Sequence, residues 1–183
     1  MFGARKSAAT WVINFVLALV VALAIPTPAK AQDNNDQPSL FGSIAKQVVL
    51  DPTTYAPAAI AYGATMRDWN TSQPLFNAGF VERNSRFTIS GLPNDRPITY
   101  GEGQRQILRD AFMNLQMSVV NNATNRLIED VLIARHPEHR KLFKTLGWVE
   151  RIGFASFLSY QLSGEHLRQA NLNEQRATQL GIR

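Results

Sequence analysis

Two of the 3 histidines, His136 and His139, have the residue type and spacing most suggestive of chemistry, in the sequence His-Pro-Glu-His. Imidazole binds zinc, but a zinc site needs further ligands in one geometry, and Glu138 and Asp130 are the nearest candidates. A metallopeptidase helix carries its two histidines four residues apart, and a di-iron bundle places a Glu three residues before each histidine. Neither pattern is present. We therefore predict no metal and no cofactor, and interpret both histidines as surface or capping residues.

Basic residues surround these histidines, with Glu138 as the one acid among them. The candidate basic patch consists of Arg135, Arg140, Lys141 and Lys144. Apolar residues follow, so the segment 135–148 is suited to contact an anionic lipid surface or a polyanionic envelope component. The alternative is an ordinary amphipathic helix with its apolar face in the core, which so short a segment favours.

A second polar and aromatic group lies between residues 69 and 102. The candidate ligand-binding surface consists of Trp69, Asn94, Asp95, Tyr100 and Glu102. Binding residues concentrate on loops held by a rigid scaffold. The same residue types also cap helices and fasten loops, and we favour that interpretation. If the protein is an enzyme instead, Asp95 or Glu102 is the expected acid.

Other reactive constellations are absent. The chain has 0 cysteines, which excludes thiol nucleophiles, iron–sulfur clusters and redox switches. It contains no Gly-x-Ser-x-Gly nucleophile elbow. Gly101-Glu-Gly103 lacks the rest of a phosphate-binding fingerprint. The sequence therefore favours a protein that is not an enzyme.

The elements that must position these residues are predicted to be helices. Apolar residues at 3–4 spacing mark a helix from 40 to Asp51-Pro52, a second from 55 to 69 and a shorter one after Pro74. The turn formers between 84 and 99 predict an irregular loop, with a short hairpin as the alternative. Thr99 and Glu102 form a capping box that starts a helix of about thirty residues.

His136-Pro137 is expected to end that long helix, because a residue before proline avoids helical angles. A short helix to Gly147 and a buried helix from 148 to 162 follow, with a kink or a new helix at Ser163-Gly164 and fraying after residue 172. We predict an all-α fold: an irregular helical bundle of five to seven helices around one long central helix.

The amino terminus predicts export. Positive residues at 5 and 6, an apolar run from 11 to 25, and the small-x-small sequence at 29–31 form a cleavable signal peptide covering 1–31. Residues 32–39 are a disordered spacer and 40–183 a single helical domain with a fraying tail. The alternative is a protein anchored in the membrane through residues 11–25, a run shorter than a spanning helix needs.

The charge of the chain argues against a nucleic-acid partner. Its net charge of +5 includes Arg5, Lys6 and Lys30 of the predicted leader. Cleavage would leave 16 basic and 14 acidic residues, a net charge of +2. So small an excess does not indicate a polyanion-binding protein.

Several short motifs resemble a family of uncharacterised exported bacterial proteins. They are Asp51-Pro-Thr-Thr-Tyr, Asp68-Trp-Asn, Phe76-Asn-Ala-Gly-Phe, Arg86-Phe-Thr and Gln106-Ile-Leu-Arg-Asp. The resemblance covers most of the predicted mature chain. It implies export from a bacterium, to the periplasm or beyond the cell, and no assigned activity or catalytic residue.

Together these observations predict an exported helical protein that binds or scaffolds in the cell envelope, with an unidentified protein or envelope component as partner. Two alternatives remain open. One is an envelope hydrolase or other enzyme with its site in the 68–102 region. The other is a peripheral membrane protein that uses 135–148. The oligomeric state does not follow from the sequence.

Overall fold

The structure is a computed structural model that describes residues 40–182. Within that range it holds α2 (Leu40–Leu50), α3 (Ala56–Asn77), α4 (Tyr100–Arg135) and α5 (Arg140–Gln179), with the short 3-10 helices η1 (Pro52–Thr54), η2 (Ser85–Phe87) and η3 (Pro137–His139). The predicted all-α class is confirmed for this range. The predicted leader (1–31) and spacer (32–39) lie outside it. None of the described helices is long and apolar enough to cross a lipid bilayer.

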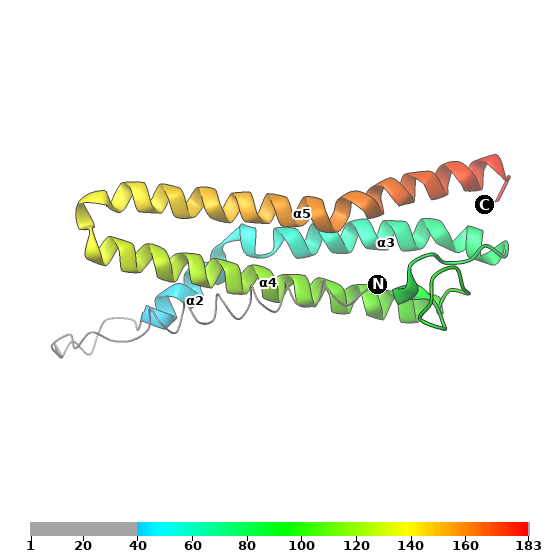
Figure 1. The fold of residues 1–183 in the computed structure, drawn as a ribbon, viewed down its shortest axis with the longest axis horizontal. Helices are drawn as coiled ribbons and strands as arrows, with labels where there is room; N and C mark the ends of the chain where they lie inside the picture. Colours follow the sequence, from blue (N-terminus) through cyan, green and yellow to red (C-terminus); the bar gives the residue numbers. More distant parts are fainter. Residues whose placement is uncertain (1–39, 183) are drawn as a thin grey trace.

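Two long antiparallel helices frame the molecule (Figure 1). α4 has 36 residues and α5 has 40, so at 1.5 Å per residue they measure about 54 and 60 Å. α4 begins with the predicted capping box of Thr99 and Glu102 and ends before His136, whose φ is −137° and ψ 69°. Pro137 excludes a helical conformation at that residue, and η3 then turns the chain into α5.

α3 lies beside both long helices over the half of the hairpin away from the turn (Figure 1). Its buried face begins with small residues, Pro57, Ala58, Ala61 and Ala64. The corresponding face of α5 is also small, with Ser163, Ala170 and Ala177 buried. Small side chains allow neighbouring helices to approach closely, which explains how three helices pack with few large core residues.

The hydrophobic core lies near the start of α4, where Trp69, Phe87 and Ile107 are buried together. The Trp69 ring lies 5.2 Å from that of Phe87 and 5.7 Å from that of Phe76, measured between centroids. Gly103 packs directly under the indole, because a Cβ at this position would lie 2.3 Å from two of its ring carbons.

The turn between α2 and α3 is fixed by Asp51, as the Asp-Pro pattern predicts. The Asp51 carboxylate accepts a hydrogen bond from the Thr53 backbone N–H at 3.0 Å and so caps η1. The same carboxylate lies 2.6 Å from Arg126 of α4 and 3.2 Å from Arg151 of α5. Arg151 also lies 3.1 Å from Glu129. We call Asp51, Arg126, Glu129 and Arg151 the buried ion network, since their side chains are only 7–13% exposed.

The segment between α3 and α4 is an irregular loop, as predicted. Two isolated antiparallel bridges, Glu82 with Asp95 and Thr88 with Pro97, are its only strand-like pairings. The alternative of a regular hairpin is not observed in this segment. Asn94 adopts φ +61°, which asparagine tolerates better than most residues.

The expected number of helices is wrong for the described residues, which hold four α-helices, of which two are long. The expected break before Pro74 does not occur. The hydroxyl groups of Thr71 and Ser72 donate to the Asp68 carbonyl at 3.0 and 2.8 Å, which adds side-chain bonds to this turn, and α3 continues to Asn77.

α5 likewise continues through two predicted boundaries. Gly147 is a packing residue rather than a stop, because a Cβ there would lie 2.5 Å from the Glu129 carboxylate. Ser163 donates to the Ser159 carbonyl at 2.6 Å, a bond that often bends a helix without ending it, and α5 bends visibly in its orange part (Figure 1). Past residue 172 the helix runs on to Gln179, where Arg176 lies over the Phe80 ring at 4.5 Å.

Candidate functional site

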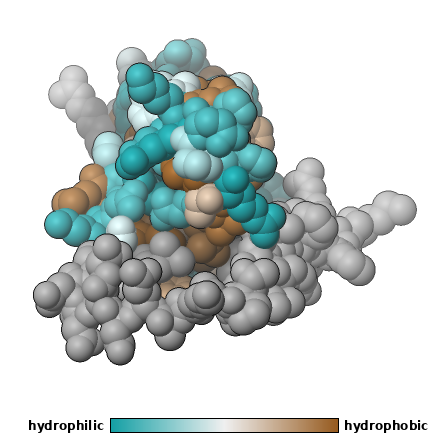
Figure 2. All heavy atoms as spheres, turned by 90° about the vertical axis from the view of Figure 1, so that its left-hand side faces the viewer, coloured by the Kyte–Doolittle hydropathy of each residue, from teal (hydrophilic) through white to brown (hydrophobic). Residues whose placement is uncertain are grey.

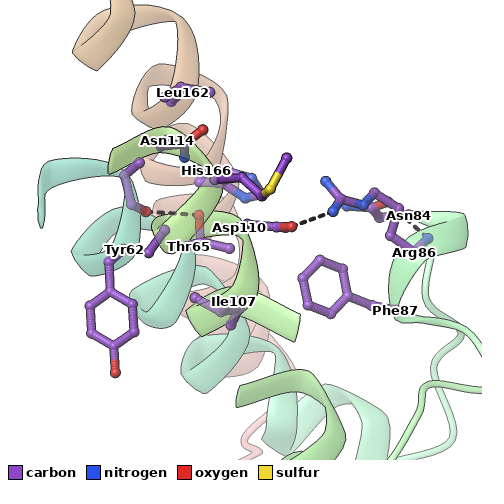
Figure 3. Close-up of a pocket in the computed structure, with 13 residues that line it drawn as sticks. Tyr62, Thr65, Asn84, Arg86, Phe87, Ile107, Asp110, Asn114, Leu162 and His166 are labelled. Carbon is purple, nitrogen blue, oxygen red and sulfur yellow. Dashed lines mark hydrogen bonds and ion pairs between the residues drawn. The ribbon is translucent and has the colours of Figure 1, made fainter. Parts of the chain in front are cut away.

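A polar cavity of about 310 Å³ lies where α3, α4, α5 and η2 meet (Figure 3). Its walls combine apolar residues with side chains that bind protons or donate hydrogen bonds. The polar ones are Tyr62, Thr65, Asn84, Arg86, Asp110, Asn114 and His166. A site with both kinds of wall is the usual form of a small-molecule pocket.

His166 lines this cavity and contacts Asp68, which lines a smaller adjoining cavity. The His166 Nδ1 lies 2.7 Å from the Asp68 Oδ2, and the two side chains are 29% and 17% exposed. A carboxylate at this distance holds a histidine in one orientation, as in many catalytic sites. Asp68 is itself held by Asn173, whose amide donates to its Oδ1 at 3.1 Å.

An ion pair between Arg86 and Asp110 lines the cavity. The 3-10 turn η2 carries Arg86 to this position, and the Asn84 side chain caps that turn by accepting from the Arg86 backbone N–H at 3.1 Å. Asp110 also accepts from the Gln106 amide at 3.2 Å. Figure 3 shows the guanidinium of Arg86 pointing at Asp110 on the side away from Tyr62.

Glu82 adds a third carboxylate near the histidine. It lines a small cavity of about 30 Å³ together with Asp68, Ser72 and His166. Burial raises the pKa of the Glu82 carboxyl, against hydrogen bonds from the backbone of Asn84 and Arg83 that lower it. An open groove of about 750 Å³ continues from here along the carboxyl-terminal half of α5.

The two α3 hydroxyl groups that line the cavities beside His166, those of Ser72 and Thr65, are not aligned as nucleophiles. The Ser72 hydroxyl donates to the Asp68 carbonyl and accepts from Asn173 at 2.8 Å. The Thr65 hydroxyl donates to the Ala61 carbonyl at 2.9 Å. A serine or threonine nucleophile needs its base within hydrogen-bond reach, and both hydroxyls are committed to helix carbonyls instead.

The predicted ligand-binding residues lie apart from the centre of this cavity. Trp69 is 4% exposed and its indole donates to the Tyr100 carbonyl at 3.2 Å. Asp95 accepts from the Ser90 backbone N–H at 3.2 Å, and Glu102 accepts from the Thr99 backbone N–H at 3.0 Å. These roles are local, with Asn94 at the exposed loop between them.

The predicted basic patch does gather in one place. Arg135, Arg140, Lys141 and Lys144 are all exposed at the α4–α5 turn. Figure 2 faces this end, and hydrophilic residues cover most of its described surface with hydrophobic surface between them. His136 and His139 flank Glu138 here, with ring nitrogens 3.5 and 3.7 Å from its carboxylate. In residues 40–182 no group of three or more metal-ligating side chains is close enough to hold an ion.

One further motif lies in α2 and was not predicted from the sequence. Ser43 and Lys46 have the Ser-x-x-Lys spacing of a serine acyl-enzyme family. Lys46 is exposed, and the Ser43 hydroxyl accepts from the Gln47 amide at 3.2 Å. Neither residue lines any of the three cavities described above.

The face of α5 opposite its buried face carries exposed apolar side chains. Leu142, Leu146, Val149, Gly153, Phe157 and Tyr160 follow one another at spacings of three and four, and we call them the outer stripe. Its large side chains are between 53% and 74% exposed. The buried residues Gly147, Arg151, Ala155 and Leu158 lie on the other side of the helix.

α4 also exposes apolar side chains over its middle. They are Leu108, Phe112, Met113, Met117, Val119 and Val120, at 38–63% exposure. Unlike the outer stripe, they divide between two sides of their helix by their spacing. Their exposed surface is therefore split between two faces of α4.

Comparison with known proteins gives no relative: no family model matches the chain, and no curated protein or solved structure is significantly similar to it. The described residues form an elongated all-α protein with four α-helices, a polar cavity and an exposed apolar face on α5. The function therefore has to be inferred from the geometry of the described residues.

Proposed function

We propose that this chain is a non-enzymatic, exported helical protein that binds or scaffolds in the cell envelope through the outer stripe of α5. The observation that carries the proposal is the exposure of Leu142, Leu146, Val149, Phe157 and Tyr160, at 53–74% on a single helix face. Each large apolar side chain that leaves water contributes about 1.5–3 kcal/mol. The stripe is therefore a favourable contact surface for another protein.

Site-specific photo-crosslinking in living cells tests this function. A photoreactive residue at Phe157 is expected to form adducts with protein, whereas the same residue at Thr178, exposed near the end of α5, is the matched control and forms none. Adducts with phospholipid at Phe157 would favour a peripheral membrane protein instead. No adduct at Phe157 would contradict the scaffold proposal.

Export is part of the proposal, and the mass of the protein recovered from the envelope tests it. Cleavage after Ala31 leaves a chain from Gln32 to Arg183. A mass that includes residues 1–31 would favour the alternative of an anchored membrane protein. A cytoplasmic full-length protein would rule out export altogether.

A second candidate, an envelope hydrolase, is favoured by the 2.7 Å contact of His166 with Asp68 beside the cavity. If Nδ1 donates to Asp68, Nε2 is the basic nitrogen that would activate water. Hydrolysis of generic ester or phosphate substrates would then be lost in His166→Gln and retained in the control His136→Gln. The absence of any hydrolysis that depends on His166 would leave the binding function standing.

A further inference from the structure

We propose that the outer stripe of α5 pairs with the outer stripe of a second copy of this chain, antiparallel, about a twofold axis at Gly153. This inference rests on the proposed function, because it names the partner of the same surface. The stripe is self-complementary in an antiparallel arrangement. With Gly153 on the axis, Val149 comes level with Phe157 of the second copy.

The same arrangement places Leu146 level with Tyr160 of the second copy. Each pair joins a smaller aliphatic residue to a larger aromatic one, which suits close packing of two helices. A twofold axis makes every contact occur twice, so that one favourable pair counts double.

Gly153 lies at the centre of the outer stripe, and no contact within the described chain requires a glycine there. It lies in the interior of α5, and a Cβ added there would meet no atom within 4 Å. Glycine weakens a helix interior relative to alanine. Glycine is favoured where another backbone must come close, and at Gly153 only a molecule outside the described chain can do so.

The charges around the stripe permit this pairing. Between Lys144 and Glu165, the only charged residues of α5 are Glu150 and Arg151, and Arg151 is buried in the ion network. The antiparallel arrangement brings exposed Lys141 level with Glu165 of the second copy. Opposite charges therefore lie at matching heights beyond the apolar centre.

The stripe is large enough for a specific interface. Phe157 and Tyr160 are 61% and 74% exposed, and an aromatic side chain buries about 150–250 Å². With the three aliphatic residues, the stripe presents roughly 500 Å² per copy, so two copies would bury roughly 1,000 Å², the lower bound of specific interfaces. A reversible dimer is the expected product.

Sedimentation tests the pairing. The protein is expressed from the full sequence and recovered from the envelope after export. Gly153→Ala is expected to weaken self-association at least tenfold. The matched control is Gly63→Ala, at an exposed helical glycine of α3 that also has open space around it. It should leave the dissociation constant unchanged. A chain that stays monomeric throughout, or equal effects of the two variants, would overturn the proposal.

Disulfide trapping tests the direction, because the chain has 0 cysteines and single-cysteine variants give an unambiguous product. Val149→Cys mixed with Phe157→Cys should form a crosslinked dimer. Either variant alone should form none, because equivalent residues would be offset by about 12 Å along the helix, beyond disulfide reach. Crosslinking of either variant alone would overturn the antiparallel arrangement.

A monomer whose Phe157 still crosslinks to another protein would refute self-pairing and leave the scaffold function intact. No protein adduct at Phe157 would refute both.

Discussion

At the scale of single residues, the polar groups at the centre of the hairpin matter most for stability. Burial alone would raise the pKa of the Asp51 carboxyl, but the hydrogen bonds from Thr53 and the charge of Arg126 lower it below its ordinary value. Two guanidinium groups balance two carboxylates, so the set is neutral. A buried charge is tolerated only when such partners are present.

Removal of one member of this set should be strongly destabilising. Arg151→Met leaves Glu129 buried without its guanidinium partner, and we expect the free energy of unfolding to fall by about 3–5 kcal/mol. Urea denaturation measures it. The control is Arg67→Met, which breaks an ion pair with Glu174 that is about half exposed and should cost less than about 1 kcal/mol. Similar losses in the two variants would show that the buried set is not structurally important.

Glu82 should make stability depend on pH in the opposite sense to Asp51. Because its pKa is raised in the folded state, its protonated form favours folding, and that contribution is lost as pH rises through the folded pKa. Glu82→Gln should therefore raise the free energy of unfolding at pH 7 and change it little below pH about 4. Urea denaturation at both values measures this, and a variant less stable than the parent at pH 7 would contradict it.

At the scale of elements, glycines determine how closely the helices approach. Gly103 at the start of α4 and Gly147 in α5 both face side chains that a Cβ would overlap. Gly101 lies two residues earlier in α4, and a Cβ added there would meet no atom within 4 Å. Two glycines only two residues apart therefore have different roles.

Alanine substitution separates these two roles. Gly103→Ala should destabilise the protein by about 1–3 kcal/mol, because the Trp69 ring must move out of its core position. Gly101→Ala should change stability little or raise it by up to about 1 kcal/mol. Thermal unfolding and Trp fluorescence report the two effects. A neutral Gly103→Ala would mean that Trp69 is not held against α4.

The ends of the helices show which structural features can be predicted from the sequence. Local chemistry predicted the start of α4, since Thr99 and Glu102 lie within one turn of each other, and its end at His136-Pro137. Pro74 and Gly147 misled because both are usual helix breakers, whereas α3 continues through Pro74 and Gly147 is a close-packing residue against Glu129.

The cavity could not be predicted from the local sequence. His166 and Asp68 are 98 residues apart and meet only because α3 packs against α5. The one local hint was the row of polar residues at helical spacing on α5, Ser163, His166 and Asn173. That pattern shows a polar buried face but does not identify the residue opposite it.

At the scale of the whole molecule, the hairpin is unequally supported. α3 covers the half that holds the core and the cavity, while the half that leads to η3 has only the short α2 and η1 beside it among the described helices (Figure 1). Residues 134–142 are all exposed. Regions with few buried contacts open at lower free energy than the core.

Hydrogen exchange should therefore be fastest at this turn. Amides of 132–146 are expected to exchange by local opening, at least tenfold faster than those of 103–122, which α3 covers. Mass spectrometry of exchanged peptides measures the difference, and the peptides of 155–173 provide an internal reference. Equal protection along the whole hairpin would mean that an additional contact covers the turn.

The buried ion network also fixes the register of the hairpin. A slide of one turn, about 5.4 Å, would carry Arg151 away from Asp51, Asn125 and Glu129 together. Asp51 would keep Arg126, but Glu129 would lose its guanidinium partner while still buried. The network therefore holds the two long helices in one alignment, and the cavity some way along the helices depends on that alignment.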